Sequence, residues 1–93
     1  MITAIVLIKA DVGAVPEVGE AIAQLPGVSE VYSVTGEHDL VAMVRVSRHD
    51  ELADVIPGLL NRTPGVVSTE THIAFRTYSK HDLEAAFSIG LEG

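Results

Sequence analysis

The chain contains four stretches with the apolar content of strands, and they are of two kinds. Residues 2–8 and 40–46 carry apolar side chains on both faces of an extended chain, which is typical of central strands. Residues 30–35 and 67–75 mix apolar positions with polar positions that edge strands tolerate. Their polar side chains include Ser33, Thr35, Ser68, Glu70 and His72. We therefore expect the first pair of strands in the centre of a sheet and the second pair at its edges.

Apolar residues between these strands recur at spacings of three and four, which predicts two amphipathic helices. The first apolar stripe is Val15, Val18, Ala21, Ile22 and Leu25, and the second is Leu52, Val55, Ile56, Leu59 and Leu60. Asp50 stands ahead of the second stripe, where it would cap the helix. Pro57 and Gly58 interrupt this helix, because a proline in a helix interior removes a hydrogen bond, and we expect a kink or an early break there.

The chain also contains an internal repeat. When it is shifted against itself so that Pro26-Gly27-Val28 falls on Pro64-Gly65-Val66, the apolar strand at 2–8 falls on that at 40–46. Each half therefore reads as strand, helix, turn and strand. Two helices can cover only one face of the resulting sheet, although the central strands are apolar on both. We expect a second copy of the chain to cover the other face.

Composition narrows the range of functions. The 93 residues suffice for one compact domain, and 47% of them are hydrophobic. Thirteen acidic against six basic side chains give a net charge of −7, so we expect no direct binding to nucleic acid. The absence of cysteine excludes disulfides, thiolate nucleophiles and sulfur-ligated zinc. The longest apolar run, at residues 4–8, is too short to span a membrane, and the start lacks the basic segment of a secretion signal, so a soluble cytoplasmic protein is expected.

Two motifs point to a family. The turn Val34-Thr35-Gly36-Glu37-His38-Asp39-Leu40 contains Gly-x-x-Asp, and Thr63-Pro64-Gly65-Val66 leads into Thr69-Glu70-Thr71. In their order and spacing these motifs resemble the effector-binding domain of the Lrp/AsnC regulators, over residues 1–78. The helix-turn-helix domain that precedes this region in the family is not in the sequence, so the chain looks like the stand-alone form called a RAM domain. Residues 79–93 would form a short extra C-terminal helix, with Ser79 and Asp82 resembling a capping box. The apolar residues of that helix would be Leu83, Ala86, Phe87 and Leu91.

The resemblance implies an α+β, ferredoxin-like βαββαβ fold with a four-stranded antiparallel sheet. It also implies dimers formed sheet to sheet as a dimeric α/β barrel, and larger assemblies that bind an amino acid between dimers. No cofactor or metal is implied. From the family, a role in the effector site carries over to Gly36, Asp39, Thr69 and Thr71.

The chemistry of an amino acid ligand suggests a division of roles, because its ammonium needs an acceptor and its carboxylate needs donors. Asp39, or less favourably Glu37, could accept from the ammonium. The backbone amides of Gly36, Glu37 and His38 and the hydroxyls of Thr69 and Thr71 could donate to the carboxylate. The alternative is that Gly36 and Asp39 only form a tight turn.

Other polar residues have more than one interpretation. Glu70 and His72 share one face of a strand, with His38 in reach across the edge, so a metal site is conceivable, although a polar edge explains them as well. Arg45 stands in a central strand, where it would form a salt bridge across the dimer or bind a carboxylate.

We therefore predict a non-enzymatic amino acid sensor that forms homodimers and higher oligomers and modulates full-length Lrp/AsnC regulators through mixed assembly. One alternative is an oligomerisation module without a ligand. The other is a small dimeric-barrel enzyme such as a monooxygenase, for which a closed pocket lined by His72 or Tyr78 would be the sign. No nucleophile elbow, phosphate loop or dinucleotide glycine pattern supports catalysis.

Overall fold

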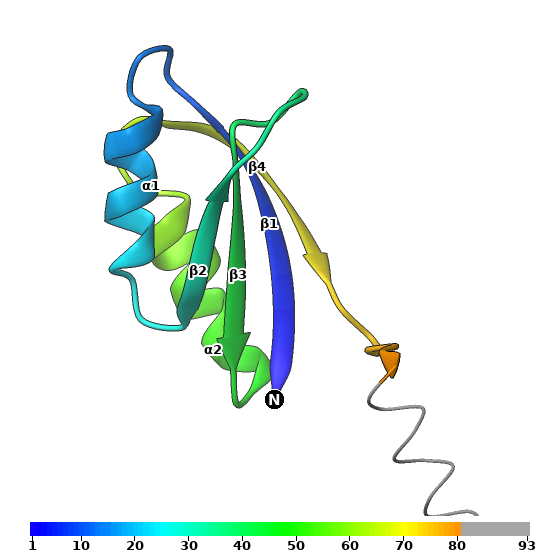
Figure 1. Ribbon diagram of the computed structural model, residues 1–93. Coiled ribbons are helices and arrows are strands. Elements are labelled where there is room, and N and C mark those ends of the chain that lie inside the picture. Colours follow the sequence, from blue (N-terminus) through cyan, green and yellow to red (C-terminus); the bar gives the residue numbers. More distant parts are fainter. Residues whose placement is uncertain (81–93) are drawn as a thin grey trace, which may run out of the picture.

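The computed structural model describes residues 1–80, and the expected C-terminal helix lies mostly outside them. The elements are β1 (Ile2–Ala10), α1 (Val15–Ala23), β2 (Val28–Ser33), β3 (Leu40–Val46), α2 (His49–Val55), a π-helical turn η1 (Ile56–Leu60) and β4 (Val66–Ile73) (Figure 1). The four strands form one sheet in the order β2-β3-β1-β4, and every neighbouring pair is antiparallel. This is the ferredoxin-like βαββαβ arrangement, so the predicted fold and the predicted central strands are confirmed.

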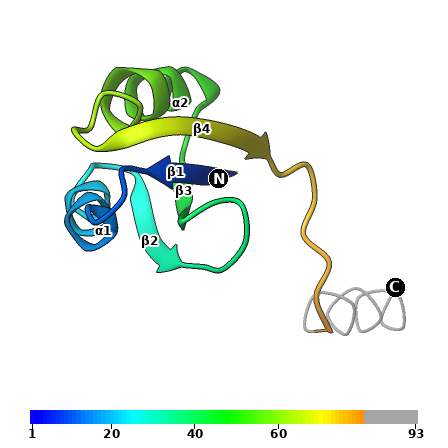
Figure 2. The same ribbon diagram turned by 90° about the horizontal axis from the view of Figure 1, so that it is seen from above.

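Both helices pack on the same face of the sheet, which we call the helix face (Figure 2). The strand side chains on this face are buried, and they include Ala4, Val6, Ile8, Leu40, Ala42 and Val44. Val6 lies opposite Ala42 in the register of β1 and β3, and Ala4 lies opposite Val44. The alternate positions of the same strands point to the other side, which we call the open face. No helix among residues 1–80 covers the open face.

Helix α1 follows most of its predicted stripe. Pro16 stands in its first turn, where a missing N–H removes no helical hydrogen bond. Val18 and Ile22 are buried against the sheet. Ala21 is exposed, contrary to the prediction, because successive residues of a helix are about 100° apart and Ala21 lies to the side of the stripe that Val18 and Ile22 form. Neither α1 nor any other helix in the described part of the chain is long and apolar enough to cross a membrane.

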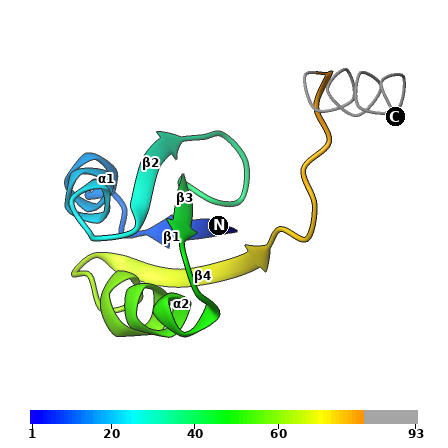
Figure 3. The same cartoon turned by 90° about the horizontal axis from the view of Figure 1, so that it is seen from below.

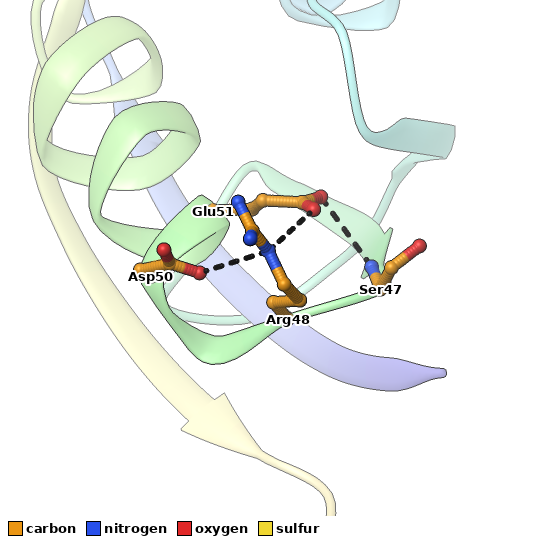
Figure 4. Close-up of polar contacts among 4 residues, drawn as sticks. All are labelled: Ser47, Arg48, Asp50 and Glu51. Carbon is orange, nitrogen blue, oxygen red and sulfur yellow. Dashed lines mark hydrogen bonds and ion pairs between the residues drawn. The ribbon is translucent and has the colours of Figure 1, made fainter.

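The start of α2 differs from the prediction (Figure 4). Its N-cap is Arg48, which is extended, so Asp50 falls inside the first turn and caps nothing. The carboxylate of Glu51 instead accepts the backbone N–H of Ser47 at 3.4 Å. Arg48 Nε lies 3.4 Å from Asp50 Oδ1 and 3.6 Å from Glu51 Oε1. Acidic side chains near the first turn favour the helix through its dipole.

The expected break at Pro57 takes the form of the π-helical turn η1. Proline cannot donate a backbone hydrogen bond, so the α-helical pattern ends at Val55. The backbone N–H of Asn61 then reaches the carbonyl of Ile56 at 2.8 Å, five residues back. The wider turn buries Leu60 but leaves Leu59 39% exposed, so the second predicted stripe is correct except at Leu59.

Candidate functional site

The loop between β2 and β3 holds four of the six predicted site residues, and it projects from one end of the sheet (Figure 1). The Val34 N–H donates to the Asp39 carbonyl at 3.0 Å and closes the loop. Gly36 has a φ of +110°, which side-chain-bearing residues rarely adopt. A Cβ at this position would meet nothing within 4 Å. Backbone conformation, and not lack of space, therefore requires glycine here.

Asp39 ties this loop to the end of β1. Its Oδ2 accepts the backbone N–H of Ala10 at 2.9 Å, and its own N–H donates to the Ile8 carbonyl at 2.9 Å. Lys9 Nζ lies 3.9 Å from the same Oδ2. The side chain of Asp39 is 28% exposed. Asp39 therefore has a structural role, as in the tight-turn alternative, and its Oδ1 has no partner among residues 1–80.

The loop also offers donors. The backbone N–H groups of Gly36, Glu37 and His38 donate to no group within the described residues. Gly36 and Glu37 are exposed and His38 is half-buried. Such free amides are suited to bind a carboxylate from outside the subunit.

Thr69 and Thr71 lie on a different side of the sheet. In the register of β1 and β4, Thr69 lies opposite Ile8 and Thr71 opposite Val6, so both belong to the helix face. The Thr69 hydroxyl donates to Asn61 Oδ1 at 2.8 Å. Asp39, in contrast, lies 3.9 Å from Lys9, which belongs to the open face with Leu7. The two threonines and Asp39 therefore do not come together within one subunit.

Asn61 is a partner of Thr69 that the sequence did not indicate. It follows directly after η1, and its contact with Thr69 joins the end of the helical layer to β4. The sequence carries only a weak signal for it, namely a polar residue placed between the second apolar stripe and the turn at Pro64.

The open face is apolar in its centre. Ile5 and Leu7 of β1 and Val41 and Met43 of β3 are half-buried on it, although no other element covers them in the described chain. Tyr32 of β2 extends this surface and is 51% exposed. Exposed apolar patches of this kind mark interaction surfaces.

Charged pairs flank this apolar centre. Arg45 donates to Glu30 of its own subunit at 3.1 Å, so Arg45 has a partner without a second copy. His72 Nε2 lies 3.1 Å from Glu70 Oε2 on β4. Within residues 1–80, no three acidic or histidine side chains lie close enough to hold a metal ion, so His38 does not join this pair.

The chain after β4 leads away from the sheet (Figure 3). The Ala74 N–H still donates to the Thr3 carbonyl at 2.9 Å. Beyond it, Phe75 is fully exposed and Tyr78 is 78% exposed. These aromatic side chains add to the apolar surface that one copy leaves uncovered.

Two of the surface hollows on residues 1–80 lie elsewhere. One, of about 440 Å³, is bordered by Val15 and Gly19 of α1 and by Val31 of β2. The other, of about 450 Å³, lies beside Val46 and Asp54 at the opposite end of the sheet from the loop. Neither hollow is lined by a residue of the predicted effector site, nor by His72 or Tyr78, whereas Arg45 borders the second.

Comparisons with known proteins agree with the fold and with the motifs. The fold defines a small α+β domain of the ferredoxin-like class. A family model described as the Lrp/AsnC ligand binding domain matches residues 3–83. The chain therefore belongs to the Lrp/AsnC family, as the sequence motifs indicated.

Individual relatives support the same assignment. The HTH-type transcriptional regulator FL11 of Pyrococcus horikoshii is 34% identical over 77 residues, which are 83% of this chain and 50% of that protein. The crystal structure of TTHA0845 from Thermus thermophilus is 52% identical with a TM-score of 0.81, and the match covers 86% of this chain and all of that one. The chain spans about half the length of the curated relatives it matches.

A more distant structure is similar in fold alone. The transcriptional regulator NMB0573 of Neisseria meningitidis, solved as a complex with L-Met, is 14% identical with a TM-score of 0.75. The match covers 84% of this chain and 52% of that one.

Proposed function

We propose that this domain binds an amino acid or a similar small metabolite at a contact between copies of the chain, and that binding changes its state of assembly. The observation that carries this proposal is the apolar open face, whose central side chains Ile5, Leu7, Val41 and Met43 no other element covers in the described chain. Covering it with a second copy would remove this apolar surface from water. The family and the L-Met complex of NMB0573 support an amino acid as the ligand.

The division of the candidate groups between two faces supports a site built from more than one copy. The free amides of the loop at 36–38 and the free oxygen of Asp39 lie at one place, and Thr69 and Thr71 at another. We expect a ligand that uses both sets of groups to take them from different subunits. Its binding would then stabilise one assembly over another by mass action.

The output of such a sensor would be a changed oligomer, read by a partner protein. A full-length regulator of the same family carries a domain of this kind, so mixed oligomers offer a route from the metabolite to transcription. The net charge of −7 argues that this domain contributes no contact to nucleic acid of its own. We propose a regulatory role in the cytoplasm without catalysis, in keeping with the relatives named as transcriptional regulators.

The test is size-exclusion chromatography with light scattering, with and without each of the common L-amino acids, paired with calorimetry. The proposal predicts that at least one amino acid gives a heat of binding in calorimetry, and that the same amino acid changes the mass measured by light scattering. An assembled protein that gives no heat and no shift with any of them would favour a ligand-free oligomerisation module.

A further inference from the structure

Thr69 and Asn61 form a polar pair between β4 and the end of the helical layer. The Thr69 hydroxyl donates to Asn61 Oδ1 at 2.8 Å. The backbone of Asn61 is held by its N–H bond to the Ile56 carbonyl at 2.8 Å. Thr69 is fixed in β4 opposite Ile8 of the central strand β1. Backbone hydrogen bonds therefore position both residues of this pair.

The direction of this bond determines what each group can offer to a ligand. A threonine hydroxyl has one proton, and here Asn61 takes it, so the Thr69 oxygen can face a ligand only as an acceptor. The Asn61 amide has two further N–H donors, and no described residue accepts them. The pair thus presents an acceptor next to donors at the surface of one subunit.

We propose that Asn61 is a positioning and binding residue of the effector site. Through its Oδ1 it turns the Thr69 oxygen toward the ligand's ammonium, and through its Nδ2 it donates to the ligand's carboxylate. This inference rests on the proposed function, and it reverses the role that the sequence suggested for Thr69, which was to hold the carboxylate. Asp39 of the same subunit accepts from the Ala10 N–H and lies 3.9 Å from Lys9, so in this assignment the Thr69 oxygen, and not Asp39, accepts from the ammonium.

Substitutions at the two positions separate the roles. Thr69→Val removes the acceptor and keeps the shape. Asn61→Asp keeps the oxygen that accepts the Thr69 proton but replaces the N–H donors with a negative charge. Thr63→Val is the control, because the Thr63 hydroxyl donates nearby at 3.1 Å to the Leu59 carbonyl and not to Asn61 or Thr69.

Three ligands complete the experiment. They are the common L-amino acid that binds most tightly, its carboxamide, which keeps the ammonium but has no carboxylate, and its des-amino acid, which keeps the carboxylate alone. Affinities are measured by calorimetry, and far-UV circular dichroism checks that each variant is folded. Thr69→Ser, which restores the hydroxyl, checks that any loss in Thr69→Val comes from the missing acceptor.

We expect each of the two variants to lower the affinity for a different pair of the three ligands. Thr69→Val should lower the affinity for the amino acid and for the carboxamide by about tenfold or more. The affinity for the des-amino acid should stay within about twofold of the wild-type value. Asn61→Asp should lower the affinity for the amino acid and for the des-amino acid by about tenfold or more, and should leave the affinity for the carboxamide unchanged. Thr69→Ser and Thr63→Val should bind all three ligands like the wild type.

The outcomes distinguish this inference from the proposed function. A wild-type protein that binds no amino acid would overturn the proposed function and this inference with it. If the wild type binds but Thr69→Val weakens the des-amino acid as much as the carboxamide, the threonine donates to the carboxylate and the inference is wrong. If the wild type binds and neither variant changes any affinity, the pair lies outside the site.

Discussion

Replacing Asp39 with alanine tests whether this residue anchors the β2–β3 loop. The change removes the acceptor of the Ala10 N–H, a bond of 2.9 Å to a carboxylate whose side chain is 28% exposed. Hydrogen bonds to a charged group contribute about 1.5–3 kcal/mol, and Ala10 is buried, so its N–H would lose its partner without gaining good access to water. The Lys9 contact at 3.9 Å adds little, because the lysine is half-exposed and such pairs contribute about 0–1 kcal/mol. We expect Asp39→Ala to lower the free energy of unfolding by about 1.5–3 kcal/mol.

The assay is urea unfolding followed by far-UV circular dichroism, with every variant at the same protomer concentration, because assembly contributes to apparent stability. Asp39→Asn retains an oxygen acceptor and should lose less stability than Asp39→Ala. Lys9→Ala is the control, with an expected change below about 0.5 kcal/mol. If Asp39→Ala unfolds within about 0.5 kcal/mol of the wild type, the carboxylate does not hold the loop and our interpretation of the bond is wrong.

The same variant has a second readout. If Asp39 also accepts from a ligand's ammonium through its free Oδ1, Asp39→Ala should reduce amino acid binding more than its loss of stability explains. A variant that is destabilised but keeps the full ligand response would confine Asp39 to the structural role.

Three further predictions concern other parts of the fold. Leu7→Glu places a charge on the open face and should reduce the mass measured by light scattering while leaving the circular dichroism spectrum native; an unchanged mass would place the interface elsewhere. Gly65 has a φ of +94°, and a Cβ there would lie 2.6 Å from a methyl carbon of α1, so Gly65→Ala should lower the free energy of unfolding by about 2–5 kcal/mol. Gly13 has a φ of +83° but open space around it, so Gly13→Ala should lower it by about 1–2 kcal/mol. Equal losses of stability would refute the steric argument. Ile22→Ala should lower the free energy of unfolding by about 2–5 kcal/mol in the same assay, and Val12→Ala, at a fully exposed position, by less than about 0.5 kcal/mol. A small loss of stability in Ile22→Ala would mean that α1 is not part of the core.

The hydrophobic pattern was sufficient to predict the two central strands and the two helices, whereas the antiparallel four-stranded form of the sheet came from the family resemblance. A strand that is apolar on both faces needs cover on both, and this placed β1 and β3 in the centre, as the structure has them. The predicted N-cap of α2 was wrong because several acidic residues stand close together there. Local sequence does not decide which of them caps the backbone and which falls within the first turn. Pro57 correctly predicted an irregular turn. The sequence did not show that the turn is π-helical, because that form goes with the burial of Leu60 in the core.

The candidate site was harder to predict. The Gly-x-x-Asp motif located a loop with free amides, and the positive φ of Gly36 fits the tight-turn chemistry of the motif. The sequence did not show that Asp39 bonds to Ala10, because that contact depends on the pairing of β1 with β3. Nor did it show that Thr69 and Asp39 lie on different faces, or that Asn61 takes the Thr69 proton, since both follow from the register and from the end of η1.

Sedimentation velocity of the wild-type protein, down to low micromolar protomer concentration, with and without the amino acid that gives heat in calorimetry, tests the central claim most directly. The account predicts that the wild type sediments as a dimer or a larger species, and that the ligand changes the distribution of species. A well-folded protein that sediments as a monomer at all concentrations, with or without the ligand, would contradict it.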